Sequence, residues 1–135
     1  MAAKAVGTFE VTAWDEKPYL EMADGRKLTR ASVTQRFSGD VEGEGSVEWL
    51  MFYREDGTAS FVGMQHVVGK IEGRSGSFVL ETSGTYDGKT ARASWSIVPG
   101  SGTNALSGLR GSGTYVAGHG STAEITLEYE LSSTG

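Results

Sequence analysis

Hydrophobic and polar residues alternate along much of the chain, most clearly in the segment 122–131. There Ile125, Leu127, Tyr129 and Leu131 fall on one face, whereas threonine and glutamate residues occupy most of the other face. A period of two is typical of a β-strand that buries one face. The pattern therefore predicts a strand over these ten residues.

Turn signals divide the rest of the chain into similar segments. Asp-Gly pairs at 24–25, 56–57 and 87–88 are typical of hairpin turns, because glycine readily adopts a positive φ. Further glycine-rich breaks lie at 39–45, 73–76, 100–102 and 118–120. Between the breaks, the predicted strands are 6–15, 28–38, 46–54, 59–70, 77–86, 90–98, 113–117 and 122–131. Only the segment 103–110 is predicted to form a short helical turn.

Eight strands joined by short turns leave no room for the helical crossovers that parallel strands need. We therefore expect an all-β fold with antiparallel neighbours. Closure into an up-and-down β-barrel would remove the exposed edges of an open sheet, which favours a barrel over a two-sheet sandwich, the competing architecture. The length of 135 residues predicts that residues 1–135 form a single β-barrel domain.

The composition limits the kinds of partner that the protein could bind. The 20 glycines exclude a helical bundle, and a net charge of −5 without a lysine and arginine cluster argues against nucleic acid. The chain has no cysteine and two distant histidines, so we expect no metal site. The loose matches to glycine-rich nucleotide-binding motifs do not stand at the start of a helix, as those motifs require. We therefore expect no cofactor. The longest apolar run, 49–53, is too short to cross a membrane, and the N-terminal residues lack a signal peptide, which predicts a cytoplasmic protein.

The strand face that points into the barrel decides which residues are candidates for catalysis or binding. Simple burial would turn the face with Phe9 and Val11 inward and leave Glu10 in water. A ligand-holding barrel would instead place a few polar groups in its cavity, with a terminus or a second subunit covering the apolar outer face, and the latter would make a homo-oligomer. Both assignments are open at this point. In the second, the acid/base candidates are Glu10, Arg36 and Glu48, and the substrate-binding candidates are Thr12, Trp14, Thr34, Leu50, Phe52 and Trp95.

Several motifs together resemble a bacterial family of small proteins known only as domain of unknown function 3224. The resemblance rests on Gly7-Thr8-Phe9-Glu10-Val11, on Phe37-Ser38-Gly39-Asp40, and on Gly100-Ser101-Gly102 followed by Gly108-Leu109-Arg110-Gly111. That family is similar to the allene oxide cyclase barrel, which belongs to the calycin-like eight-stranded barrels. The resemblance implies a barrel with a cavity but no assigned reaction.

The similarity to allene oxide cyclase places Glu10 at the position of the catalytic glutamate and Thr34 at that of a water-holding asparagine. Three departures weaken it, because Thr12, Lys17 and Phe52 stand where the cyclase has asparagine, serine and cysteine. The resemblance therefore does not imply allene oxide cyclisation itself.

Three functions are compatible with these observations. The first is a cofactor-free cyclase or isomerase that folds a hydrophobic metabolite into a reactive conformation, with Glu10 as its acid or base. The second is a non-catalytic carrier or protective binder of a hydrophobic small molecule. The third is a structural or oligomerising domain with a filled interior.

Overall fold

A computed structural model of the chain describes residues 3–118 and 122–131, and it consists of strands and one short helical turn. The predicted break at 118–120 lies partly outside these residues. The 3-10 turn η1 (Asn104–Leu106) confirms the predicted helical turn. The strands are β1 (Ala3–Glu21), β2 (Lys27–Gly39), β3 (Val41–Tyr53), β4 (Ala59–Ile71), β5 (Arg74–Tyr86), β6 (Ala91–Ile97), β7 (Leu109–Ala117) and β8 (Thr122–Leu131).

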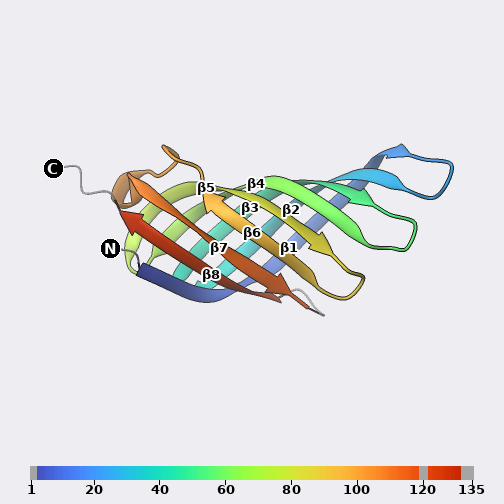
Figure 1. The fold of residues 1–135 in the computed structure, drawn as a ribbon. Coiled ribbons are helices and arrows are strands. Elements are labelled where there is room, and N and C mark those ends of the chain that lie inside the picture. The colour runs from blue at the N-terminus through green and yellow to red at the C-terminus, as the bar shows by residue number, and fades with distance from the viewer. Residues whose placement is uncertain (1–2, 119–121, 132–135) are drawn as a thin grey trace.

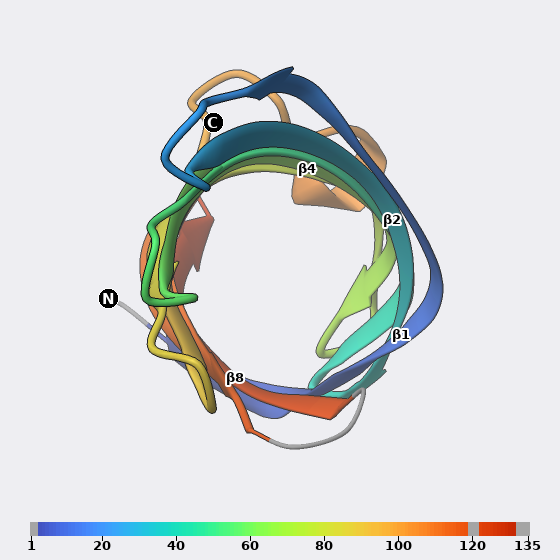
Figure 2. The same ribbon diagram turned by 90° about the vertical axis from the view of Figure 1, so that its right-hand side faces the viewer.

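The strands close into one antiparallel barrel in sequence order, which confirms the predicted fold class. Each strand pairs with its neighbour in the chain, and β1 pairs with β8 from Ala3↔Tyr129 to Glu10↔Thr122. Figure 2 looks along the barrel and shows the strands as a continuous ring. In Figure 1, the β1–β2, β3–β4 and β5–β6 turns lie at one end, and η1, the start of β1 and the end of β8 lie at the other.

The Asp-Gly pairs form the expected turns, with φ near +90° at Gly25, Gly57 and Gly88. The predicted break over 39–45 is shorter than expected. Asp40 alone separates β2, which ends at Gly39, from β3, which begins at Val41 and includes Gly43. The strand predicted over 113–117 likewise begins earlier, at Leu109, because its first residues pair with the last residues of β8.

The end of the barrel that carries η1 is closed by side chains. Strand β6 stops at Ile97, and the connection that follows continues beside β5: the Thr103 amide donates to the Ser77 carbonyl at 2.9 Å. This connection places Leu106 fully in the core. Gly76 makes room for the connection, because a Cβ at Gly76 would lie 2.1 Å from the Thr103 carbonyl oxygen and 3.2 Å from the Cβ of Leu106.

Apolar side chains fill the middle of the barrel. Phe9, Phe37, Trp95 and Tyr115 are buried there, and neighbouring ring centroids are 5.2–6.4 Å apart. The apolar faces of the strands therefore point inward, as simple burial favours. Among the strands that the structure describes, only β1 changes the face that it turns inward along its length.

A β-bulge in β1 exchanges the two faces of that strand. Val11 pairs with Gln35 and Ala13 with Thr34, so that Thr12 is an extra residue in β1. An extra residue reverses the side-chain alternation beyond it. Phe9 and Val11 therefore face inward before the bulge, and Trp14 and Glu16 face inward after it.

Strands β3 and β4 approach each other closely at Gly69, so a substitution there tests the packing of the barrel wall. Gly69 of β4 lies opposite Gly43 of β3, and a Cβ on Gly69 would lie 1.8 Å from the Glu42 carbonyl oxygen. We predict that Gly69→Ala lowers the free energy of unfolding in urea by about 1–3 kcal/mol, because the strands must separate. Gly118→Ala is the control, since its added Cβ meets no atom within 4 Å. Equal stability of the two variants would contradict the packing described here.

Candidate ligand cavity at the open end

A cavity of about 480 Å³ opens at the end of the barrel that carries the hairpin turns. We call it the mouth cavity. Its volume lies within the range that is usual for small-molecule sites. Aromatic and aliphatic side chains make most of its wall, and among these residues none carries a formal charge. They are Phe9, Val11, Trp14, Trp49, Met51, Tyr53, Phe61, Tyr86, Ala91, Tyr115, Ala117 and Gly118.

Aromatic rings pack against one another in the wall of the mouth cavity. The indole of Trp49 lies 5.5 Å from the rings of both Trp14 and Phe61, measured between centroids. Gly63 permits this position, because a Cβ there would lie 2.4 Å from the Cδ1 atom of Trp49. On another part of the wall, Tyr115 packs edge-on against Phe9 at 5.2 Å. The cavity is therefore built on strands and not on loops.

The carboxylate of Glu16 links several side chains at the rim of the mouth cavity. Glu16 accepts hydrogen bonds from the Thr29 hydroxyl at 2.6 Å, from the Tyr53 hydroxyl at 2.6 Å and from the Trp14 indole N–H at 3.0 Å. The ammonium of Lys27 lies 5.1 Å from the centre of the Tyr53 ring. Side chains of three strands, β1, β2 and β3, thus meet at one charged group.

Burial raises the pKa of Glu16, but the hydrogen bonds from Thr29, Tyr53 and Trp14 and the charge of Lys27 lower it by more. The pKa therefore lies below the usual glutamate value of 4.5, and the carboxylate is ionised at neutral pH. The pKa of Tyr53 is raised by burial and by its hydrogen bond to Glu16, so its hydroxyl keeps its proton. Burial alone raises the pKa of Tyr115.

The three acid/base candidates from the sequence lie outside the barrel. Glu10 precedes the bulge and is exposed. Arg36 pairs on the surface with Glu44 at 3.4 Å, and Glu48 pairs with Arg30 at 2.7 Å. The structure therefore does not bring them together around the cavity, because their strands bury the opposite, apolar face.

Of the residues predicted to bind substrate, some lie inside the barrel and the others on its outer surface. Trp14 lines the mouth cavity, and Trp95 is buried below it, where its indole N–H donates to the Thr126 carbonyl at 3.1 Å. The other four lie on the outer surface: the hydroxyls of Thr12 and Thr34 hydrogen bond to each other, and Leu50 and Phe52 face outward from β3.

Sequence reasoning missed Glu16, Trp49, Tyr53 and Tyr115 as site residues. Trp49 and Tyr53 belong to the apolar face of β3, and that alternation alone would have found them had the inward direction been known. Glu16 had no comparable signal, because the bulge that turns it inward is not visible in the alternation.

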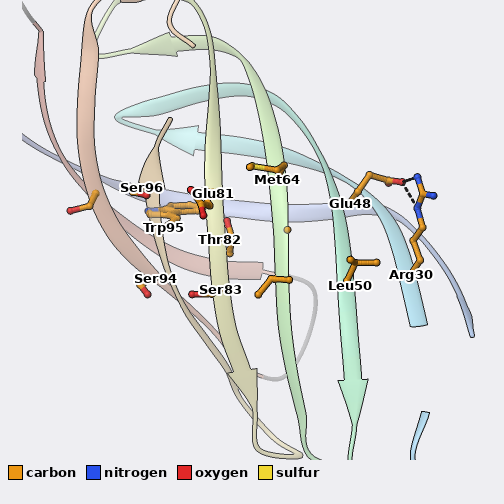
Figure 3. A pocket seen from close by; sticks show the side chains of 13 residues that line it. Arg30, Glu48, Leu50, Met64, Glu81, Thr82, Ser83, Ser94, Trp95 and Ser96 are labelled. Carbon is orange, nitrogen blue, oxygen red and sulfur yellow. Dashed lines mark hydrogen bonds and ion pairs between the residues drawn. The ribbon is translucent and has the colours of Figure 1, made fainter. Parts of the chain in front are cut away.

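A second hollow, of about 840 Å³, lies on the outer surface over β3 to β6 (Figure 3). Leu50, Val62 and Met64 are about half exposed in it, and serines from β5 and β6 lie beside them. The ion pair of Arg30 and Glu48 forms its edge. This outer groove is open to water along the wall, whereas the mouth cavity is surrounded by the buried faces of the strands.

Residues 3–118 and 122–131 contain no group of three histidine, aspartate or glutamate side chains placed to hold a metal ion. In the same part of the chain, no helix is long and apolar enough to span a membrane.

The family model of a protein of unknown function, DUF3224, matches residues 5–129. The chain belongs to the DUF3224 family. A crystal structure of a DUF3224 protein of unknown function from Shewanella oneidensis MR-1 is similar to it, with a TM-score of 0.80 and 28% sequence identity. The similarity covers 98% of this chain and 99% of that one. None of the curated proteins matches the chain.

The lowered pKa of Glu16 in this DUF3224 protein leads to a prediction about pH. A carboxylate whose pKa is lower in the folded state stabilises that state at neutral pH, and this contribution is lost as the pH falls through the lowered pKa. We therefore expect Glu16→Gln to reduce the free energy of unfolding by about 1 kcal/mol at neutral pH, after allowing for its partial exposure. Below the lowered pKa, the difference from the wild type should disappear.

Urea unfolding across the acid range measures this difference. The control is Glu10→Gln, which removes the same charge from an exposed position on the same strand and is expected to change stability little. A loss at neutral pH that is equal for both variants would contradict the special role of Glu16.

Proposed function

We propose that this DUF3224 protein binds a small hydrophobic molecule in the mouth cavity, as a carrier or a protective binding protein. The observation that supports this most is the contrast between the two ends of the barrel. Leu106 closes one end, whereas at the other end aromatic side chains surround about 480 Å³ of open volume. A purely structural barrel would have no need for such a cavity.

The character of the wall favours an apolar ligand. Trp14, Trp49, Phe61 and Tyr86 offer flat aromatic surfaces, and Met51 adds a flexible, polarisable side chain. Trp14 is 47% exposed although it lies at the cavity, so a ligand in the mouth would cover apolar surface that now faces water.

A cyclase or isomerase reaction in the same cavity stays a prediction of the sequence, as does the link to the allene oxide cyclase barrel. Glu10, Arg36 and Glu48 lie on the outer surface and do not support it. Glu16 does lie at the rim, but its lowered pKa and its three hydrogen bonds make it a weak base. A reaction here would therefore depend on the shape imposed on the substrate. Binding without chemistry is the simpler proposal.

Cavity-filling substitutions test the proposed function. Ala91 and Ala117 both line the mouth cavity, and a larger side chain at either would occupy it. We expect Nile red, a neutral hydrophobic dye, to bind the wild-type protein with an increase in fluorescence. Ala91→Trp and Ala117→Phe should each weaken this binding by about tenfold or more, since each removes ligand volume from the site.

The matched control separates the mouth cavity from the outer groove. Met64→Glu puts a charge into the outer groove, where Met64 is 54% exposed, and leaves the mouth cavity unchanged. Dye binding should survive this substitution. Loss of binding in Met64→Glu, with binding retained in both cavity-filling variants, would overturn the proposed site; circular dichroism establishes that each variant is folded.

A further inference from the structure

Aromatic rings dominate the wall of the mouth cavity: seven of its twelve lining residues are phenylalanine, tyrosine or tryptophan. The face of an aromatic ring carries a partial negative charge, so it attracts a cation that lies over it. None of the lining residues is cationic. The cavity therefore combines apolar surface with a negative electrostatic character and supplies no positive charge from its own wall.

Three of these rings are accessible at the opening. Trp14 is 47% exposed, and Tyr53 and Tyr86 are partly exposed. Tyr53 and Tyr86 both pair with Ala59 of β4, so they stand at the same level of the barrel with only a methyl side chain between them. A ligand that enters the mouth cavity can therefore contact aromatic surface before it reaches the buried rings.

The aromatic wall is curved. The rings of Trp14 and Trp49 are inclined to each other by 52°, and those of Trp49 and Phe61 by 54°. Inclined rings do not form a flat slot for a planar molecule. They suit a rounded group such as an alkylated ammonium, which aromatic cages bind through the faces of several rings.

The carboxylate of Glu16 makes two of the accessible rings more negative. It accepts hydrogen bonds from the Trp14 indole N–H at 3.0 Å and from the Tyr53 hydroxyl at 2.6 Å, and it is ionised at neutral pH. A hydrogen bond to a charged acceptor polarises the donor group and shifts electron density toward the ring. Both the full charge of Glu16 and the polarised rings thus favour a cation at the rim.

One ammonium group of the protein already shows this preference. The Nζ atom of Lys27 lies 5.1 Å from the centre of the Tyr53 ring, and the charge of Lys27 helps to lower the pKa of Glu16. A ring of the wall and the rim carboxylate therefore hold a cation together. Lys27 is not among the lining residues of the cavity, and in the described part of the chain no cation lies over the Trp14 or Tyr86 ring.

We propose that the ligand of this protein is an organic cation with an apolar body, such as a tertiary or quaternary amine, whose charged head lies among Trp14, Tyr53 and Tyr86 beside Glu16. This inference rests on the proposed function and names the chemical class that the site selects. An anionic ligand is disfavoured, because Glu16 repels it and the wall offers no positive partner. The net charge of −5 also favours the approach of a cation.

Three probes that differ only in the charge of a tetrahedral head group test the proposal. They are naphthylmethyl-trimethylammonium, neopentylnaphthalene, in which carbon replaces the charged nitrogen, and naphthylmethanesulfonate. Equilibrium dialysis measures the affinity of each probe for the full chain. We expect the ammonium to bind about tenfold more tightly than the hydrocarbon, and the sulfonate to bind more weakly than both. A site that only buries apolar surface would prefer the hydrocarbon, since water solvates the ammonium far better.

Two substitutions of Trp14 assign the preference to an aromatic face. Trp14→Leu and Trp14→Phe both remove the indole N–H that Glu16 accepts, but only Trp14→Phe keeps a ring. We expect the ammonium to bind about fivefold more weakly to Trp14→Leu than to Trp14→Phe. The affinity for neopentylnaphthalene should be similar in the two variants.

Two charge substitutions at the rim should act in opposite directions. Glu16→Gln should weaken ammonium binding about fivefold or more, because it removes the rim charge. Lys27→Met should strengthen it, because it frees the Tyr53 ring and leaves Glu16 without its neighbouring cation. Neither should change the affinity for the hydrocarbon. Glu10→Gln is the matched control, since it makes the same change of net charge on the outer face and should leave ammonium binding unchanged.

The outcomes distinguish this inference from the proposed function. Equal or tighter binding of the hydrocarbon or the sulfonate would overturn the cation inference and leave the proposed function standing. A preference for the ammonium that persists unchanged in both Trp14→Leu and Glu16→Gln would also overturn it, since the cation would then bind elsewhere. Failure of all three probes and of Nile red to bind would overturn the proposed function and with it the inference.

Discussion

Closure of the sheet between β1 and β8 is the constraint on which the rest of the molecule depends. A closed barrel of eight strands has a fixed inner radius, and its interior is just wide enough to be filled by side chains or to hold one small ligand. At each level of the barrel, the size of the inward-facing side chains therefore decides whether the interior is filled or leaves space for a ligand. Phe9, Phe37 and Trp95 fill the middle, and Leu106 fills one end. At the other end Ala91 and Ala117 are small, and space remains.

The bulge at Thr12 determines the chemistry of that space. Without the extra residue, Trp14 and Glu16 would continue the outward face of Glu10, and the opening would lose both its exposed indole and its carboxylate. With it, Glu16 faces Thr29 and Tyr53 and links β1, β2 and β3 at the rim. One inserted residue thus converts part of an outer wall into the border of a cavity. Bulges are common at barrel rims and beside functional sites for this reason.

The fold could be predicted because the signals that mark its turns and strands each lie within a short stretch of the sequence. Asp-Gly pairs mark the turns, and an alternation such as Ile125, Leu127 and Tyr129 marks a buried strand face without reference to the rest of the chain. The site could not be predicted in the same way. The placement of Glu10 outside and Glu16 inside depends on a register shift between β1 and β2, and this shift arises from the pairing of two strands.

Trp95 and Leu50 illustrate a second limit of the sequence. Both are large and apolar and both belong to strands with good alternation, yet Trp95 is 3% exposed and Leu50 is 49% exposed. Alternation separates the two faces of a strand but does not identify which face is inside. The correct choice follows from summing the apolar residues of all eight faces, because closure requires every strand to turn the same kind of face inward.

The polar groups of the mouth cavity fall into two sets, those that have partners at the rim and those that are buried without a partner among the described residues. Glu16 accepts hydrogen bonds from the donors of Trp14, Thr29 and Tyr53 at the rim, which leaves the opening lined mainly by aromatic surface. The indole N–H of Trp49 and the hydroxyl of Tyr115 are buried and have no hydrogen-bond partner among the described residues. Because burial raises the pKa of Tyr115, its hydroxyl remains a neutral donor throughout the physiological range. Under the proposed function, the affinity for an apolar ligand would therefore come from the aromatic surfaces of the cavity wall and not from these two buried atoms.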